Sequence, residues 1–184
     1  AVPVLRRALE IRKAQYPEGS PEIAQSLDRL ADPLSLLSKN DEAEQLLREA
    51  LAIHRRALPP GDSTIATEMN NLAQVLLMRG AYDEAEAMLR EAVQMQDRLP
   101  NDPSIARTYD NLANTLTTLN KRDEAEKYMR LALRTRIAKY PPGHPEIALG
   151  QNNLATMLTA AKKYEEAEKL YREAAKIAPA DAME

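Results

Sequence analysis

The sequence contains no cysteine, no tryptophan and no phenylalanine. Without cysteine the chain can form neither a disulfide nor a thiolate metal site. A core this poor in aromatic residues must be built from leucine, isoleucine, methionine and alanine, which helices accommodate better than small sheets do. These absences favour an all-α protein.

Two further absences limit the classes of function. The formal net charge is −3, from 25 Lys and Arg against 28 Asp and Glu, so the chain lacks the basic character of a nucleic-acid-binding domain. No apolar run approaches the roughly 18 residues that a membrane-spanning helix needs, and the first residues lack the layout of a secretory signal. We therefore expect a cytoplasmic protein with neither nucleic-acid nor membrane partners.

The sequence does contain an internal repeat with a period of about 42 residues. A Leu-Ala pair begins at four positions that are 42, 40 and 42 residues apart: Leu30, Leu72, Leu112 and Leu154. The string Asp-Glu-Ala-Glu, with Glu first in the last copy, follows the same spacings: Asp41, Asp83, Asp123 and Glu165. Two independent markers in one register indicate a repeat protein.

Each repeat predicts two helices, such as Ser63 to Arg79 and Asp83 to Arg98, with Asp62 as a cap and an apolar stripe on each helix. Such stripes are buried only when neighbouring pairs stack. We expect about nine helices in stacked antiparallel pairs, forming a right-handed α-solenoid. The predicted array is a single domain over 1–184, with a partial unit and four full units: 1–18, 19–60, 61–100, 101–142 and 143–184. Because the first repeat is incomplete, we expect a fragment of a longer protein.

The repeated strings resemble those of the tetratricopeptide repeat, through the Leu-Ala pair, the Glu-Ala of the second helix and a later alanine such as Ala92. The period exceeds the usual ~34 residues. That length, the turn at Gly143-His144-Pro145 and the Asn152-Asn153 pair resemble the longer subclass found in kinesin light chain, nephrocystin-like proteins and bacterial signalling ATPases and kinases. The resemblance implies a non-enzymatic scaffold that holds a peptide or protein in a concave groove lined by the first helices.

One face of the first helices is rich in asparagine, which is a mediocre helix former and therefore needs a reason. This face, here called the groove face, lies opposite the apolar stripe. The candidate peptide-binding residues on it are Arg29, Thr67, Asn70, Asn71, Gln74, Arg107, Asp110, Asn111, Asn114, Asn152 and Asn153. The remaining positions of the same face are Gln25, Asp28, Asp32, Leu149 and Thr156.

Two interpretations of the asparagines are open. Asn71, Asn111 and Asn153 can form a ladder of amides that grips the backbone of an extended peptide, since each amide offers a donor and an acceptor. Alternatively, these amides bond to the adjacent helix and hold the array together. The equivalent residue in the first full unit is Arg29, which could pair with Asp28 or Asp32 or meet an acidic group of the ligand.

The groove face carries two arginines against three aspartates, a net charge of 2 − 3 = −1, so we expect a guest of mixed or neutral charge. We expect no catalytic residue, no cofactor and no metal. An alternative function is a structural or regulatory spacer within a larger signalling protein. Leu170 and Ile177 leave an apolar stripe on the last helix, which predicts end-to-end self-association. Pro33, inside a first helix, predicts a break or bend over residues 30–33.

Overall fold

The computed structural model describes residues 1–97 and 104–177. Within these ranges the chain forms nine α-helices and no β-strand, which confirms the all-α prediction. Internal contacts divide the chain into two compact units, unit 1 (Ala1–Pro100) and unit 2 (Asn101–Glu184), and each is described by itself. The predicted division of one array into repeats stays a prediction, and its boundary at residues 100 and 101 lies outside the described residues.

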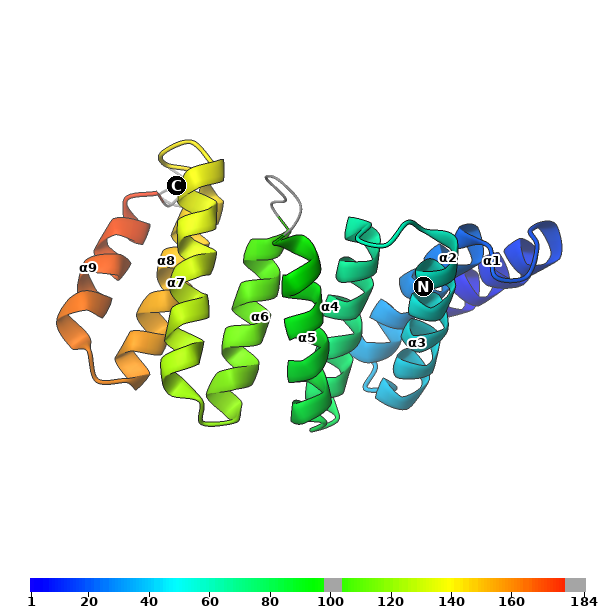
Figure 1. Ribbon diagram of the computed structural model, residues 1–184, viewed down its shortest axis with the longest axis horizontal. Helices are drawn as coiled ribbons and strands as arrows, with labels where there is room; N and C mark the ends of the chain where they lie inside the picture. The colour runs from blue at the N-terminus through cyan, green and yellow to red at the C-terminus, as the bar shows by residue number, and fades with distance from the viewer. Residues whose placement is uncertain (98–103, 178–184) are drawn as a thin grey trace. The chain divides into compact units, whose positions relative to one another are not determined.

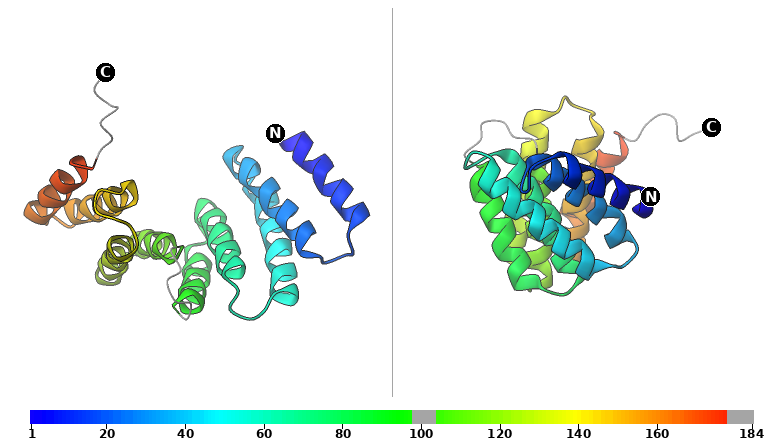
Figure 2. Two further views of the ribbon diagram at one scale, coloured as in Figure 1. Left: turned by 90° about the horizontal axis from the view of Figure 1, so that it is seen from above. Right: turned by 90° about the vertical axis from the view of Figure 1, so that its right-hand side faces the viewer.

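Consecutive helices within each unit pack against one another, and their connecting turns alternate between the two ends of the helices (Figure 1). In Figure 2, for example, α1 and α2 lie side by side and run in opposite directions. Unit 1 holds α1 (Val2–Gln15), α2 (Pro21–Leu36), α3 (Asn40–Ala57), α4 (Ser63–Met78) and α5 (Tyr82–Gln96). Unit 2 holds α6 (Ile105–Thr118), α7 (Arg122–Lys139), α8 (Pro145–Ala160) and α9 (Tyr164–Ala175).

Helix starts follow the capping chemistry expected from the sequence. The Asp62 side chain accepts a hydrogen bond from the backbone N–H of Thr64 at 2.8 Å, which satisfies one orphan donor at the start of α4. Hydrogen bonding from the side chain and then the backbone of Thr64 lowers the pKa of Asp62. His144 performs the same task for α8, because its Nδ1 atom accepts from the N–H of Glu146 at 3.2 Å.

A left-handed turn ends every first helix at the same place in the repeat. The turn residue has a φ of 58° to 77° at Ser38, Gly80, Asn120 and Lys162. The next N–H then donates to the carbonyl five residues earlier; Lys39 to Leu34, at 2.9 Å, is one example. This bond satisfies a C-terminal carbonyl and reverses the chain, so that the second helix of each pair returns along the first.

Small residues let the helices approach closely. Ala50, Ala92 and Ala132, which occupy equivalent positions of the second helices, are each 0% exposed. The equivalent Ala8 is exposed, and α1 as a whole has no buried residue. Among the described residues, no helix is both long enough and apolar enough to cross a membrane.

The break predicted at Pro33 is wrong, because α2 continues as one helix from Pro21 to Leu36, whereas the bend stays a prediction. A proline inside a helix removes one N–H and crowds the carbonyl four residues earlier. Here the proline lies in the last turn of α2, and Leu30, Ala31 and Leu34 around it are at most 1% exposed. Their burial against neighbouring helices stabilises this turn despite the missing donor.

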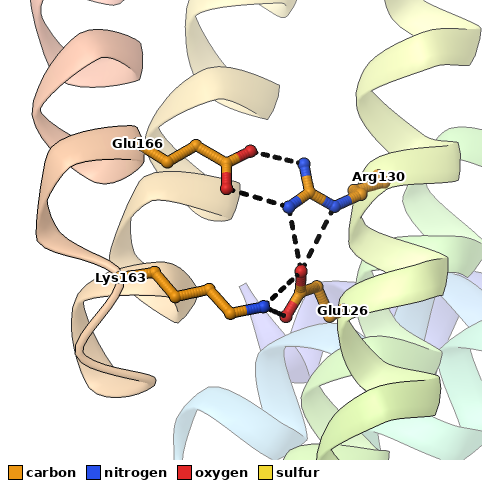
Figure 3. Close-up of polar contacts among 4 residues, drawn as sticks. All are labelled: Glu126, Arg130, Lys163 and Glu166. Atoms are coloured by element: carbon orange, nitrogen blue, oxygen red, sulfur yellow. Dashed lines mark hydrogen bonds and ion pairs between the residues drawn. The ribbon is translucent and has the colours of Figure 1, made fainter.

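An arginine at one position of the second helices bonds to a glutamate 36 residues later, at the start of the next second helix, as at Arg6, Arg48 and Arg130. Arg48 contacts Glu84 at 2.6 Å in unit 1, and Arg130 contacts Glu166 at 2.6 Å in unit 2. Figure 3 shows the second case, in which Glu126 joins Arg130 to Lys163 and so closes a network of four charges. Bonding to Lys163 and Arg130 lowers the pKa of Glu126. The acidic strings therefore serve packing between repeats as well as the helix dipole.

We expect Arg130→Ala to lower the free energy of unfolding by about 1 kcal/mol, because partly exposed pairs contribute little singly but several join here. The matched control is Arg172→Ala at the equivalent position of α9. Among the described residues Arg172 bonds only to Glu168, with side chains 76% and 62% exposed, so its loss should change stability by less than about 0.5 kcal/mol. Urea unfolding followed by circular dichroism measures both, and equal effects would contradict the network.

Candidate functional site

Most residues of the groove face are accessible in both units. Gln25, Arg29 and Asp32 on α2 are exposed, as are Arg107 and Asn114 on α6. On α4, Gln74 is exposed, and Thr67 and Asn71 are partly exposed. On α8, Leu149, Asn152 and Thr156 are exposed, and Asn153 is partly exposed. Asn111 on α6 is also partly exposed. In each unit the first helices thus present a polar surface, although Leu149 is an apolar exception.

Two candidate residues do not lie on this surface as the sequence predicted. Asn70 is 1% exposed and Asp110 is 6% exposed, so the expectation that they face solvent is wrong. The helical wheel places both residues at the edge of the polar face, and Asp110 is covered there by Arg136 and Asn153 of the following helices. A wheel drawn for one helix cannot show how far its neighbours extend over that edge.

The amides of Asn71 and Asn153 bond to the preceding first helix of their own unit. Asn71 donates through Nδ2 to Asp28 at 2.9 Å, and Asn153 donates through Nδ2 to Asp110 at 3.3 Å. The interpretation in which these amides hold adjacent helices together is therefore confirmed for these two residues. Because an ionised carboxylate can only accept, each amide must turn its NH₂ group toward the acid. Among the described residues, neither Asn71 nor Asn153 uses its Oδ1 atom in a hydrogen bond.

Unit 2 has a groove beside Asn153 with a volume of about 470 Å³. It lies between α6 and α8 and reaches the first half of α7. Its lining residues are Asn114, Thr117, Arg122, Asp123, Ala125, Glu126, Met129, Asn153, Thr156, Met157, Ala160, Ala161 and Lys163. Ala125 and Met129 are buried and Met157 is half-buried, which makes the floor apolar, whereas Asn114 and Thr156 are exposed and make the rim polar. The groove thus combines an apolar floor with amide and hydroxyl groups, as ligand sites commonly do.

The aspartate that accepts from Asn153, Asp110, also belongs to a buried ion pair. Arg136 of α7 donates through Nη2 to Asp110 at 2.6 Å and through Nε to Glu146 at 3.2 Å, and the Arg136 side chain is 4% exposed. Gly150 makes room for it, because a Cβ atom there would lie 3.1 Å from Cδ of Arg136. Burial raises the pKa of Asp110, although Arg136 opposes that rise.

The corresponding layer of unit 1 contains acids instead of this arginine. His54, equivalent to Arg136, is 4% exposed, and its Nδ1 atom lies 3.3 Å from Oε1 of Glu68. Glu68, equivalent to Gly150, is also 4% exposed and hydrogen-bonds to the Asp28 side chain. Burial, helped by Asp28, raises the pKa of Glu68 to about 8, so Glu68 is mostly protonated at neutral pH. Burial also lowers the pKa of His54, which keeps its imidazole neutral.

Sequence reasoning missed this layer, although a signal was present. The four equivalent residues of the second helices are all polar: Arg12, His54, Gln96 and Arg136. A polar residue at one position in four of the five second-helix copies, with Ala178 in the fifth, indicates a shared contact. His54 belongs to this set and is 4% exposed.

Stacked antiparallel helix pairs of this kind define the α-solenoid repeat proteins. Within that class the chain belongs to the tetratricopeptide repeat family. A family model described as tetratricopeptide repeat matches residues 63–138 and 123–180, and a second model with the same description matches residues 23–63. The sequence-based identification is thereby confirmed. Among curated proteins, none matches this chain.

Solved structures resemble the chain in fold. A variant of nearly identical TPR-like repeats, assigned to a kinesin light chain of Podosopora anserina, has a TM-score of 0.81 at 22% identity, covering 96% of this chain and 84% of that one. BtubC (BKLC) from P. vanneervenii has a TM-score of 0.78 at 23% identity, covering 94% and 70%. The apo form of RapI has a TM-score of 0.79 at 16% identity, covering 96% and 48%. At these identities the likeness is one of fold.

Family and fold together make the chain a protein-interaction module, of a scaffold type that is typically non-enzymatic. The identity and chemistry of what it binds depend on the side chains of each unit, because a shared fold does not fix function.

Proposed function

We propose that the chain is a non-catalytic module that holds an extended peptide segment of a partner protein against the groove faces of its first helices. The observation that carries this proposal is the unit 2 groove, where Asn114, Asn153 and Thr156 of the groove face line an apolar floor. Main-chain groups of a peptide can bond to the amides while one apolar side chain of the peptide lies on Met129 and Met157.

The orientation of the asparagines supports this proposal. Because Asn153 gives its NH₂ group to Asp110, its Oδ1 atom remains to accept a backbone N–H of the guest. The same holds for Asn71 and Asp28 in unit 1. An amide that is already fixed by a neighbour loses little conformational entropy on binding, which favours affinity. The amide ladder and the bond between helices are thus two uses of one side chain.

The charge of the groove face favours a guest without a strong excess of either sign. Arg107 and Asp32 are both exposed, and Arg122, Asp123 and Lys163 line the unit 2 groove. The complete set of proposed contacts is Arg29, Thr67, Asn71, Gln74, Arg107, Asn111, Asn114, Asn152 and Asn153. Asn70 and Asp110 are left out because they are buried.

The proposal is tested by selecting short peptides from a random display library and measuring their affinity by fluorescence anisotropy. We expect Asn114→Ala to weaken peptides bound in unit 2 about fivefold, because it removes one hydrogen bond from an exposed residue. Ala160→Phe, which places a ring in the groove, should weaken them more than tenfold. Lys169→Ala, an exposed substitution on α9 away from the groove, is the control and should have no effect.

A spacer within a larger signalling protein would give a different result. Such a spacer would select no peptide above background, and none of these variants would change its properties beyond stability. If peptides are selected but Ala160→Phe leaves their affinity unchanged, binding occurs outside the unit 2 groove.

A further inference from the structure

Equivalent aspartates in the two units have different charged groups beside them. Asp28 in unit 1 and Asp110 in unit 2 each accept a hydrogen bond from the asparagine of the following first helix. Beside Asp110 lies a cation, Arg136, whose Nη2 atom is 2.6 Å from the carboxylate. Beside Asp28 lies a second carboxyl group, that of Glu68, which in turn contacts the neutral imidazole of His54. Unit 1 therefore lacks the positive charge that unit 2 contains.

Buried polar atoms without hydrogen-bond partners occur in this layer of both units. Among the described residues they are Oε2 of Glu68 and Nδ1 of His54 in unit 1, and Oδ1 of Asp110 and Nη1 of Arg136 in unit 2. Such atoms are rare in folded proteins because each costs free energy. Asp28, to which Glu68 bonds, is partly exposed, so the buried acid connects through Asp28 to the surface of the unit.

We propose that Asp28 and Glu68 form a subsite of unit 1 that takes one lysine or arginine side chain of the bound peptide. This inference rests on the proposed function, since the cation arrives as part of the guest segment. An ammonium or guanidinium group at Asp28 supplies the charge that Arg136 supplies to Asp110.

The charged groups around the subsite favour a cation. On α2, Asp32 lies one turn after Asp28 and its negative charge acts on Glu68. The negative charges of Asp28 and of Asp62, before α4, both act on His54. Arg29 is the nearest cation in sequence, yet it is exposed and bonds to neither Asp28 nor Asp32 among the described residues. The same residues do not suit a metal ion, since the described part of the chain has no group of three side chains able to hold one.

Binding of the cation is coupled to release of a proton. In the free protein Glu68 holds a proton that its carboxyl shares with Asp28, because burial disfavours the charged form of Glu68 and the neighbouring Asp28 carboxylate repels a second negative charge. When the guest cation arrives, Glu68 loses this proton to solvent, and one cation then faces two carboxylates. The bound state therefore has one proton fewer than the free state, and affinity should rise with pH up to about pH 8, where free Glu68 ionises.

The test uses three short peptide libraries that differ only in one fixed central residue, lysine, glutamine or glutamate. We expect the lysine library to bind about tenfold more tightly than the glutamine library at pH 8, as for a hydrogen bond between charged groups. That advantage should fall as the pH is lowered, by at most about tenfold per pH unit. Calorimetry in two buffers of different protonation enthalpy should detect the released proton.

Two variants separate the subsite from general electrostatics. Glu68→Gln should remove the proton release and the pH dependence, and Asp28→Asn should remove the preference for lysine. Glu49→Gln, which makes the same charge change at an exposed position of α3, should leave both intact. Circular dichroism checks that every variant is folded.

The outcomes distinguish this inference from the proposed function. If no library binds, the proposed function fails and the subsite with it. If the libraries bind but lysine and glutamine are equal, or if Glu68→Gln keeps the pH dependence, only the cation subsite is overturned.

Discussion

Replacing Glu68 with glutamine is expected to stabilise unit 1 at pH 8 by roughly 2–4 kcal/mol. Burial raises the pKa of Glu68 from 4.5 to about 8, and a shift of one pKa unit corresponds to about 1.4 kcal/mol. Glutamine has the shape of the protonated acid, and its NH₂ group can donate to Asp28 as the carboxyl O–H does. The variant keeps this hydrogen bond without having to retain a proton.

The pH dependence of this effect follows from proton binding. Between about pH 4.5 and 8 the unfolded chain has released the Glu68 proton and the folded chain still holds it. Since the folded state binds more protons in this window, its stability falls as the pH rises. The contribution of Glu68 is complete below about pH 4.5 and is lost as the pH passes through 8, so the two proteins should converge in acid.

Urea unfolding of both proteins from pH 4.5 to 8.5 measures the effect, and the difference between them cancels titrating groups that lie away from Glu68. Glu91→Gln on the exposed face of α5 is the control and should stay within about 0.5 kcal/mol of the native protein. Parallel curves for Glu68→Gln and the native protein would show that Glu68 is ionised in the folded state.

Arg136→Met is expected to have the largest destabilising effect, about 3–5 kcal/mol in unit 2, because it leaves the Asp110 carboxylate buried without a partner charge. The loss should be smaller near pH 4, where Asp110 can take up a proton, since burial already raises its pKa. Urea unfolding monitored by circular dichroism measures the change. A Met side chain retains much of the apolar volume, so the effect reports mainly on charge.

The double variant Arg136→Met with Asp110→Asn should recover most of this loss, because it removes both charges of the pair and leaves an amide for Asn153. Arg134→Met on the same helix is the control, since Arg134 is exposed and should change stability by less than about 0.5 kcal/mol. A double variant as unstable as Arg136→Met alone would show that Arg136 acts through packing.

Helix positions could be predicted well because each rests on a local signal. α4 was expected from Ser63 to Arg79 and runs to Met78, and the Asp62 cap is present. The break at Pro33 could not be judged locally, since burial of its neighbours decided the outcome. The end-to-end association expected from Leu170 and Ile177 stays a prediction.

The candidate site was predictable in part, for a reason visible at Asn70 and Asn71. These neighbours share the polar side of the wheel, yet one is 1% exposed and the other is partly exposed. Whether a guest can reach a residue on the polar side depends on how much of that side is buried by packing against other helices. Packing between helices cannot be read from the wheel of one helix.

The sequence by itself determined the repeat, the helix pairs and their polar face, because 3.6-residue periodicity and capping act over a few residues. Only the tertiary structure decided that Asn71 and Asn153 give their NH₂ groups to aspartates, and that a buried Glu68 stands where Gly150 stands in unit 2. These contacts join residues about 40 positions apart, and their effect on charge depends on burial. No local pattern contains that information.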